Sequence, residues 1–292
     1  MKSIQVGQNR CGDSEKVYTI AEIGINHNGS LENALKLIDH AIEAGYTAVK
    51  FQKRTVDVVY SESELNKPRE SVFGQTNGDL KYGLEFSATE YNEISNYCKS
   101  KNIAWFASPW DEESVGFLES FEVIAHKVAS ACLTDKSLLS EIGKTEKPVF
   151  LSTGMSTLSQ IEKAIKAIGH EKIILLHCVS AYPVKNEDLN LAVIETLRKT
   201  FNLNVGYSGH EVGVLPSIIA VAKFGACVIE RHITLDRAMW GSDQSASLEI
   251  SGSRKLISYI NESFEVVGNS DKVILDIEIE NMRKLRRVDD FK

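Results

Sequence analysis

Short runs of β-forming residues alternate with helical patterns along nearly the whole chain, and this alternation constrains the fold more than any other feature. We expect strands at about 17–24, 46–52, 102–108, 123–130, 147–153, 172–178, 203–208 and 226–232. Between them, apolar residues recur at helical spacing. Strands that alternate with helices indicate a parallel sheet, and eight is the number of strands that closes a (β/α)8 barrel.

Polar residues at the strand ends distinguish a closed barrel from an open doubly wound sheet. In a barrel the carboxyl ends converge on one mouth, where the active sites of this fold lie, whereas an open sheet would spread them along an edge. We therefore predict one α/β domain, a (β/α)8 TIM barrel, over residues 1–292. Nearly every expected strand delivers a polar or ionisable side chain at its carboxyl end: Glu22, Lys50, Gln52, Ser108, Lys127, Ser130, Ser152, His177, Ser208 and His232.

Two of the expected helices carry signals for their first and last turns. Ser30 is placed to cap a helix whose apolar face begins at residue 31, and Gly45 follows its end. In the second helix Thr157 and Gln160 have capping-box spacing, and Gly169 follows the last turn. These signals predict helices over about 31–44 and 158–168.

The connection over residues 53–85, after the second strand, is abnormally long. Loops of this length in compact domains are usually functional or disordered. Because this one leaves the mouth side, we interpret it as a lid or an acceptor-binding loop. The tail, 269–292, is charged and helical at most, so we expect no second domain.

Composition and charge exclude several classes of function. The net charge is −7, which argues against nucleic acid as the partner. No apolar run reaches the length of a membrane span, and the first residues lack the apolar core of a signal peptide. The five cysteines are odd in number and form no CxxC pair. They suit a reducing cytoplasm better than a disulfide framework.

Two histidines stand at the ends of neighbouring expected strands. His210 lies just past the seventh strand and His232 ends the eighth. Since adjacent strand ends of a barrel lie close together, two imidazoles could bind one metal ion. Such a site would leave open positions for substrate oxygens and water, as a Lewis-acid catalyst needs. The alternative is that each histidine is a hydrogen-bonded structural residue.

Two lysines lie inside apolar runs, where an unpaired ammonium group is costly. Lys50 and Lys127 could each pair with a carboxylate such as Glu22 or Glu230. The functional interpretation is a cationic pocket for a small dianion, with hydroxyl donors from Ser108, Ser130, Ser152 and Ser208. Glu22 is then either a counter-ion or a group that binds sugar hydroxyls. By strand alternation we expect Glu230 to orient His232 and Arg231 to face the helices.

At this point the motifs match a known family. They closely resemble the sialic acid synthases, which include the N-acetylneuraminate and N-acylneuraminate-9-phosphate synthases and the legionaminic and pseudaminic acid synthases. The resemblance covers roughly residues 15–285 and rests on AEIGINHNGSLENALKLIDHAIEAGYTAVKFQ, LSTGMSTLSQI, HCVSAYP, GYSGHEVG, ERHITLD and GSDQSASLE. It implies a cytoplasmic C–C bond-forming transferase, a homodimer, that condenses phosphoenolpyruvate with an N-acyl-mannosamine-type aldose, free or phosphorylated. A divalent metal is implied, Mn²⁺ first, with Mg²⁺ or Co²⁺ as alternatives.

The family's functional residues can be carried over position by position. His210 and His232 match its metal ligands. Catalytic roles fall to Glu22, Lys127, His210 and His232. Phosphoenolpyruvate contacts are matched by Lys50, Ser108, Lys127, Ser130, Ser152 and Ser208. The sugar side is matched by Glu22, Gln52, Tyr182 and Asp243, with Ser180 where some members carry Asn.

Three departures from the family pattern leave alternatives open. Cys132 stands where the family has an acidic residue thought to act on water, and Gln244 stands where many members have His. The small antifreeze-like domain that most members carry after the barrel is also expected to be absent. The chain could therefore be a synthase of another 3-deoxy-2-keto sugar acid, or a catalytically silent barrel that acts as a partner subunit.

Overall fold

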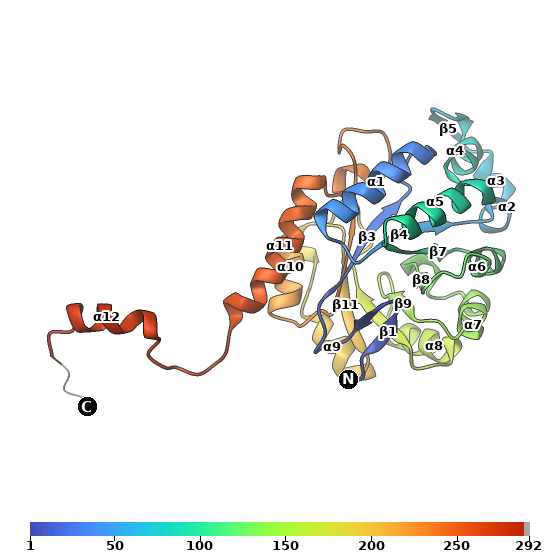
Figure 1. Ribbon diagram of the computed structural model, residues 1–292. Coiled ribbons are helices and arrows are strands. Elements are labelled where there is room, and N and C mark those ends of the chain that lie inside the picture. Colours follow the sequence, from blue (N-terminus) through green and yellow to red (C-terminus); the bar gives the residue numbers. More distant parts are fainter. Residues whose placement is uncertain (289–292) are drawn as a thin grey trace.

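Eight parallel strands form the closed barrel that the sequence predicts. The computed structural model describes residues 1–288 (Figure 1). Neighbouring strands follow the order β3-β4-β7-β8-β9-β10-β11-β12, and β12 pairs with β3 to close the sheet. Their bounds are β3 Tyr18–Gly24, β4 Ala48–Lys53, β7 Ala104–Pro109, β8 His126–Val128, β9 Val149–Ser152, β10 Ile173–His177, β11 Asn204–Gly209 and β12 Val228–His232. All eight expected strands are confirmed, with ends that shift by a few residues.

The strand register brings the polar ends together. His232 of β12 is paired with Glu22 of β3, and Glu22 is paired with Lys50 of β4. Because the strands are parallel, every carboxyl end reaches the same rim. Below that rim the barrel is filled with apolar side chains such as Phe106 and Phe150, which stack at 5.3 Å between ring centroids. The rigid apolar core thus carries a polar mouth.

Helices surround the barrel, and the predicted end signals are present. They are α1 Leu31–Ala44, α5 Ala88–Ser100, α6 Glu112–Glu119, α7 Lys136–Lys144, α8 Leu158–Ile168, α9 Val193–Phe201, α10 Leu215–Ala222 and α11 Ile250–Val267. Ser30 accepts a hydrogen bond from the Asn33 amide at the start of α1, and α8 begins with the Thr157–Gln160 capping box. Both helices end at a glycine in the left-handed region. The two helix predictions are confirmed.

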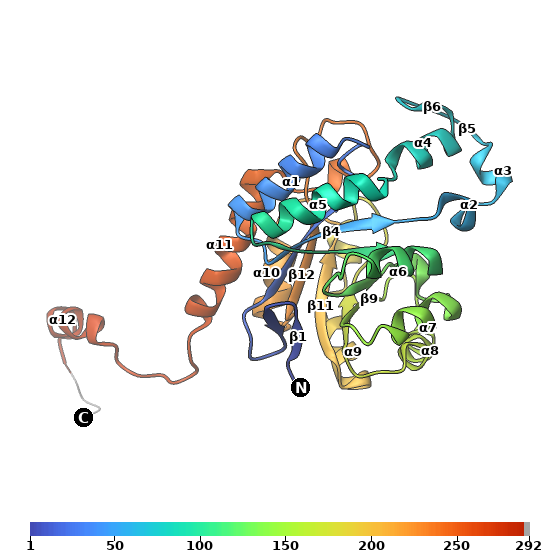
Figure 2. The ribbon, with the colours of Figure 1, turned by 45° about the vertical axis from the view of Figure 1, so that its right-hand side comes forward.

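The long connection after β4 is folded rather than irregular. It contains α2 Val56–Val59, α3 Glu62–Leu65, the hairpin β5 Pro68–Ser71 and β6 Gly74–Thr76, and α4 Asn77–Leu84. At its base Glu85 binds Lys53 and the backbone amide of Arg54. Figure 2 shows this excursion beyond the tip of β4, on the mouth side of the barrel. Its position suits the lid or acceptor-binding role, which remains a prediction.

Two terminal segments lie outside the barrel pattern. The hairpin of β1 Ile4–Val6 and β2 Asn9–Cys11 was not predicted. It lies against the amino-terminal end of the barrel, where Cys11 Sγ is 3.8 Å from Cys227 Sγ. At the other terminus α12, Asp276–Leu285, buries no residue and stands away from the barrel (Figures 1 and 2). The tail prediction for 289–292 falls outside the described residues. Through residue 288, every helix is too short or too polar to cross a membrane.

Candidate active site

A cavity of about 290 Å³ opens at the carboxyl ends of the strands. Every predicted site residue lines it except Asp243, which lies at the rim with Oδ2 3.9 Å from His232 Nδ1. The structure therefore brings together side chains spread over more than two hundred residues of sequence. Their chemical roles stay predictions. The lining comprises Glu22, Lys50, Gln52, Ser108, Trp110, Lys127, Ala129, Ser130, Ala131, Ser152, Met155, Ser180, Tyr182, Ser208, His210, Glu230 and His232.

The two buried lysines have different partners. Lys50 Nζ lies 2.6 Å from Glu22 Oε2 and 3.7 Å from Glu230 Oε2. The ion pair that the sequence offers for Lys50 as one alternative is therefore present. Lys127 Nζ donates to the Val128 carbonyl at 2.9 Å and to Ser152 Oγ at 2.5 Å. Among residues 1–288, Lys127 has no carboxylate within 4 Å, so its charge is free to bind an anion.

The two buried carboxylates beside Lys50 differ in acidity. Burial raises the pKa of Glu22 to about 7, although Lys50 acts in the opposite direction. Burial would also raise the pKa of Glu230, but Lys50 and Lys127 lower it to about 2. Two carboxyl groups whose pKa values are driven apart commonly take different roles in a reaction. Glu230 is a permanent anion here, whereas Glu22 can gain or lose a proton near neutral pH.

The imidazoles of His210 and His232 meet over the mouth. Their ring centroids are 5.6 Å apart. His210 Nδ1 lies 2.9 Å from the Val179 carbonyl oxygen, which can only accept, so this nitrogen carries a proton and Nε2 keeps its lone pair. Burial lowers the pKa of both rings, to about 4 for His210. Both are therefore neutral at pH 7, which is the form that binds metal ions.

The donor set fits a two-imidazole metal clamp and no larger protein shell. His232 Nδ1 is buried and has no hydrogen-bond partner. Within the described part of the chain, no group of three or more His, Cys, Asp or Glu side chains is arranged to hold a metal ion. A metal bound to His210 and His232 would therefore need substrate oxygens or water to complete its coordination, as the sequence argument anticipates.

Gly154 lets three side chains converge at one wall of the mouth. A Cβ atom at this position would lie 2.5 Å from Ser180 Oγ, 2.8 Å from Ser130 Oγ and 3.0 Å from Cys178 Sγ. Any side chain would therefore displace these groups. Across the mouth, the half-exposed ring of Tyr182 covers His210, with 4.1 Å between ring centroids. Ser130, Ser180 and Tyr182 thus enclose the same space.

The three ionisable residues that end β12 have separate partners. Glu230 accepts from Ser208 Oγ at 2.9 Å. Among residues 1–288 it accepts no hydrogen bond from His232, so it does not orient that ring through one, contrary to the expectation. Arg231 faces the helices, as predicted, and is fully buried. It binds Glu211 at 2.8 Å and donates to Ser217 at 3.1 Å. Each charge in this strand is compensated or aimed at the mouth, which explains how the strand tolerates them.

Two of the three departures from the family pattern, Cys132 and Gln244, lie at buried positions. Cys132 is 6% exposed and does not line the mouth. Burial first, and Asp135 second, raise the pKa of its thiol to about 11, so it is protonated at neutral pH. Gln244 donates to the Asn26 carbonyl and to Asn28 Oδ1, each at 3.3 Å. It braces the loop after β12 against the loop after β3.

The mouth residues that sequence reasoning missed include Trp110 and Met155. Trp110 directly follows the end of β7, a position that could have identified it. The guanidinium of Arg54 stacks on its ring at 4.2 Å and also donates to Gln52 Oε1. Arg54, at the start of the long excursion, thereby contacts both Trp110 and Gln52.

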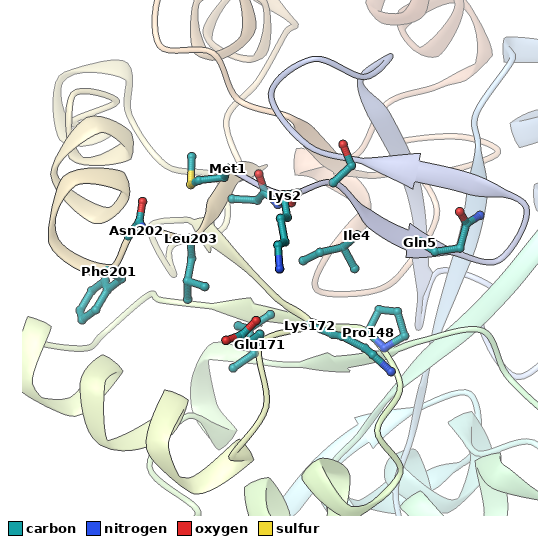
Figure 3. A pocket seen from close by; sticks show the side chains of 13 residues that line it. Met1, Lys2, Ile4, Gln5, Pro148, Glu171, Lys172, Phe201, Asn202 and Leu203 are labelled. Carbon is teal, nitrogen blue, oxygen red and sulfur yellow. Dashed lines mark hydrogen bonds between the residues drawn. The ribbon is translucent and has the colours of Figure 1, made fainter.

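A larger cavity, of about 690 Å³, lies at the opposite end of the barrel (Figure 3). Figure 3 shows the Lys2 side chain of the amino-terminal segment extending toward Glu171 and Lys172, which precede β10. This end carries none of the predicted site residues. Active sites of (β/α)8 barrels lie at the carboxyl ends of the strands, so we place the site at the smaller cavity.

The comparison with protein families decides the family of the chain. The sequence profile of the NeuB family matches residues 37–272. The chain belongs to the NeuB family. This confirms the resemblance drawn from the motifs, and the NeuB match spans β4 to α11, which includes both histidines and both lysines.

Named relatives of this NeuB chain are synthases of sialic acids and related sugars. It is 40% identical to the N-acetylneuraminate-9-phosphate synthase of Drosophila melanogaster, over 80% of this chain and 64% of that one. It is 34% identical to the N,N'-diacetyllegionaminic acid synthase of Campylobacter jejuni, over 94% and 84%. The solved N-acetylneuraminic acid synthetase of Leptospira borgpetersenii is 31% identical over 98% of both chains, with a TM-score of 0.84.

Proposed function

We propose that this chain condenses phosphoenolpyruvate with an N-acyl-mannosamine-type aldose to give a sialic acid or related nonulosonic acid and phosphate. The observation that carries the proposal is Lys127, a buried ammonium group without a carboxylate partner among residues 1–288. It faces the same cavity as two neutral imidazoles and a proton-exchanging carboxyl group. A small anion and an electrophile would therefore be held side by side, as the family relationship supports.

The anion side of the cavity fits phosphoenolpyruvate. Lys127 and Ser152 lie on β8 and β9, and Ser108 lies next to Lys50 at 3.2 Å. Charge-assisted hydrogen bonds from these groups would neutralise the phosphate and the carboxylate. Holding both reactants in one orientation supplies much of the rate enhancement in bimolecular reactions of this type.

The reaction then balances as follows. The π electrons of the enol form a bond from C3 to the aldehyde carbon, and the aldehyde oxygen becomes an alkoxide. Water adds to the resulting cation at C2 and gives a proton to Glu22, which passes it to the alkoxide. The C2–O bond to phosphate breaks and its electrons leave with phosphate. The remaining proton on the added oxygen goes to phosphate, and C2 becomes a ketone.

A divalent metal, which we take to be Mn²⁺, would be held by His210 and His232. When bound, it would polarise the aldehyde and stabilise negative charge on its oxygen. The chain's own residues contribute the remaining steps. Tyr182 covers His210, and Gln52 Nε2 donates to Glu22 Oε1 at 2.9 Å, which fixes the carboxyl group that exchanges protons.

The test is phosphate release from phosphoenolpyruvate with a panel of aldoses. We expect release with N-acetylmannosamine or its 6-phosphate and not with arabinose 5-phosphate or erythrose 4-phosphate. Phosphoenolpyruvate labelled with ¹⁸O in the bridging position should transfer the label to phosphate, because the C–O bond breaks. Preference for a five- or four-carbon acceptor would instead indicate another 3-deoxy sugar acid synthase. No release with any aldose would indicate a silent barrel.

A further inference from the structure

A second cavity, of about 680 Å³, opens beside the mouth. We call it the side cleft and define it by Ile25, Asn28, residues 69–72, Leu80, Lys81, Leu84 and residues 240–242. These residues come from the loop after β3, from the long excursion and from the loop after β12. None of them lines the mouth cavity.

The side cleft presents two cations without paired anions. Arg69 and Lys81 both line it. Within residues 1–288, neither has a carboxylate within 4 Å. Arg69 donates to the Asn77 side chain at 3.2 Å, and Lys81 Nζ lies 4.9 Å from the centre of the Tyr60 ring. Glu70 is the acidic residue of the lining, and its side chain is exposed.

The electrostatics of Lys81 indicate an accumulation of positive charge. Burial lowers its pKa first, and the nearby charges of Arg54 and Arg69 lower it further. Asp243 and Glu64 oppose this effect from a distance. Since Glu64 is already paired with Lys67, the local excess of cations remains. A dianion would relieve the repulsion and would gain charge-assisted hydrogen bonds.

Asp243 connects the side cleft to the mouth. It follows Ser242 of the cleft, its carboxylate is 3.9 Å from His232, and its charge reaches Lys81. An acceptor whose aldehyde lies at the two histidines would therefore pass Asp243 with its hydroxyl-bearing carbons. The opposite end of such a sugar would point toward Arg69 and Lys81.

A neutral donor belongs to the same wall. Asn28 lines the cleft, and its Nδ2 is buried without a hydrogen-bond partner. Gln244 holds the oxygen of this amide at 3.3 Å, which fixes which way the amide points. The departure at Gln244 thus supports the wall of the side cleft rather than the chemistry at the mouth.

We propose that the side cleft binds a phosphate group on the acceptor carbon farthest from the aldehyde, so that the acceptor is a sugar phosphate. This inference rests on the proposed condensation and names its substrate class. Arg69 and Lys81 supply the charge and Asn28 belongs to the wall behind them. Phosphate is favoured over a hydroxyl group because a dianion would accept charge-assisted hydrogen bonds from both cations, of which Lys81 is half-buried and Arg69 is exposed.

The test compares N-acetylmannosamine with its 6-phosphate at saturating phosphoenolpyruvate. We expect the wild-type protein to favour the phosphate ester at least tenfold in kcat/KM. Arg69→Gln and Lys81→Gln should each lower kcat/KM for the ester about 10–100-fold, the range for a lost charge-assisted contact. Turnover of the free sugar and the KM for phosphoenolpyruvate should not change. Lys99→Gln, at an exposed position of α5 outside the cleft, is the matched control.

Direct binding separates this inference from the proposed function. Calorimetry of the 6-phosphate should show binding to the wild-type protein that weakens in Arg69→Gln and Lys81→Gln, even if no acceptor is turned over. Equal losses for the free sugar and the ester would overturn the inference while leaving the condensation intact. So would stimulation of free-sugar turnover by inorganic phosphate that disappears in the variants, because that result would assign the cleft to a free effector.

Discussion

Replacing Lys127 by methionine should stabilise the fold while it removes anion binding. The Lys127 side chain is 2% exposed, and its ammonium group has two hydrogen-bond acceptors but no ion pair within residues 1–288. Burial lowers its pKa. Methionine keeps most of the length of the stem and removes the charge. Sites that need a costly buried group for function commonly sacrifice stability in this way.

The magnitude follows from the cost of burial. Burying an incompletely compensated polar group costs roughly 1–3 kcal/mol by mutational data. The variant also removes the donor to Ser152, a loss of about 1 kcal/mol. We therefore expect Lys127→Met to raise the free energy of unfolding by up to about 2 kcal/mol at pH 7.

The pH dependence has a definite sign. Because folding lowers the pKa of Lys127, the unfolded chain binds more protons than the folded chain between the lowered pKa and the ordinary value of about 10.4. The wild-type protein should therefore gain stability as pH rises through that window, as its ammonium group loses its proton. Lys127→Met should lack this contribution, and its advantage should shrink toward high pH.

Urea unfolding with a check that the m-value is unchanged measures the stability, and calorimetry measures phosphoenolpyruvate binding. Binding should weaken about 10–150-fold, as expected for a lost contact to a charged group. Lys163→Met, at an exposed position of α8, is the control and should change stability by less than about 0.5 kcal/mol. A variant that is clearly less stable than wild type would refute the burial argument. Unchanged affinity for phosphoenolpyruvate would remove Lys127 from the anion site.

Three further predictions concern the mouth. His210→Ala and His232→Ala should each abolish metal-dependent turnover and the Mn²⁺ binding that calorimetry measures. The circular dichroism spectrum should stay unchanged. Normal activity of both variants in chelator-treated buffer would exclude the two-histidine metal site. Glu22 must lose its proton to accept one from water, so wild-type kcat/KM should rise with pH through about 7. Glu22→Gln should lower kcat about 10²–10⁴-fold and should lose this rise of kcat/KM with pH. If the variant keeps the rise, the titrating group is a residue other than Glu22. Cys132→Ala should keep most of the activity because the buried thiol stays protonated. Complete loss of activity in a variant that still binds both substrates would show that the thiol has a chemical role.

The local sequence contained enough information for the barrel and for its mouth. Strand and helix periods are properties of neighbouring residues, so the eight strands and the caps at Ser30 and Thr157 could be predicted. The polar ends of the strands follow from the same periods, because parallel strands end at one rim. The hairpin at residues 4–11 carried only short strands and a weak turn signal at Gly7, and it was missed.

Only the tertiary structure decided which ionisable side chains form ion pairs or hydrogen bonds with one another. Lys50 and Lys127 look alike in the sequence, yet Lys50 pairs with Glu22 while Lys127 has no carboxylate partner within residues 1–288. The sequence predicts that Glu230 orients His232, but its carboxylate instead accepts a hydrogen bond from Ser208.

The sequence by itself determined the periodic elements, the rim on which the polar residues gather and the family. The tertiary structure decided the ion pairs, the acidity of Glu22 and the side cleft, whose walls come from three segments far apart in the chain. The physical reason is the distance along the chain over which each kind of interaction acts. Hydrophobic periodicity acts over a few residues, whereas ion pairing and desolvation depend on strand register and burial, which exist only once the barrel has closed.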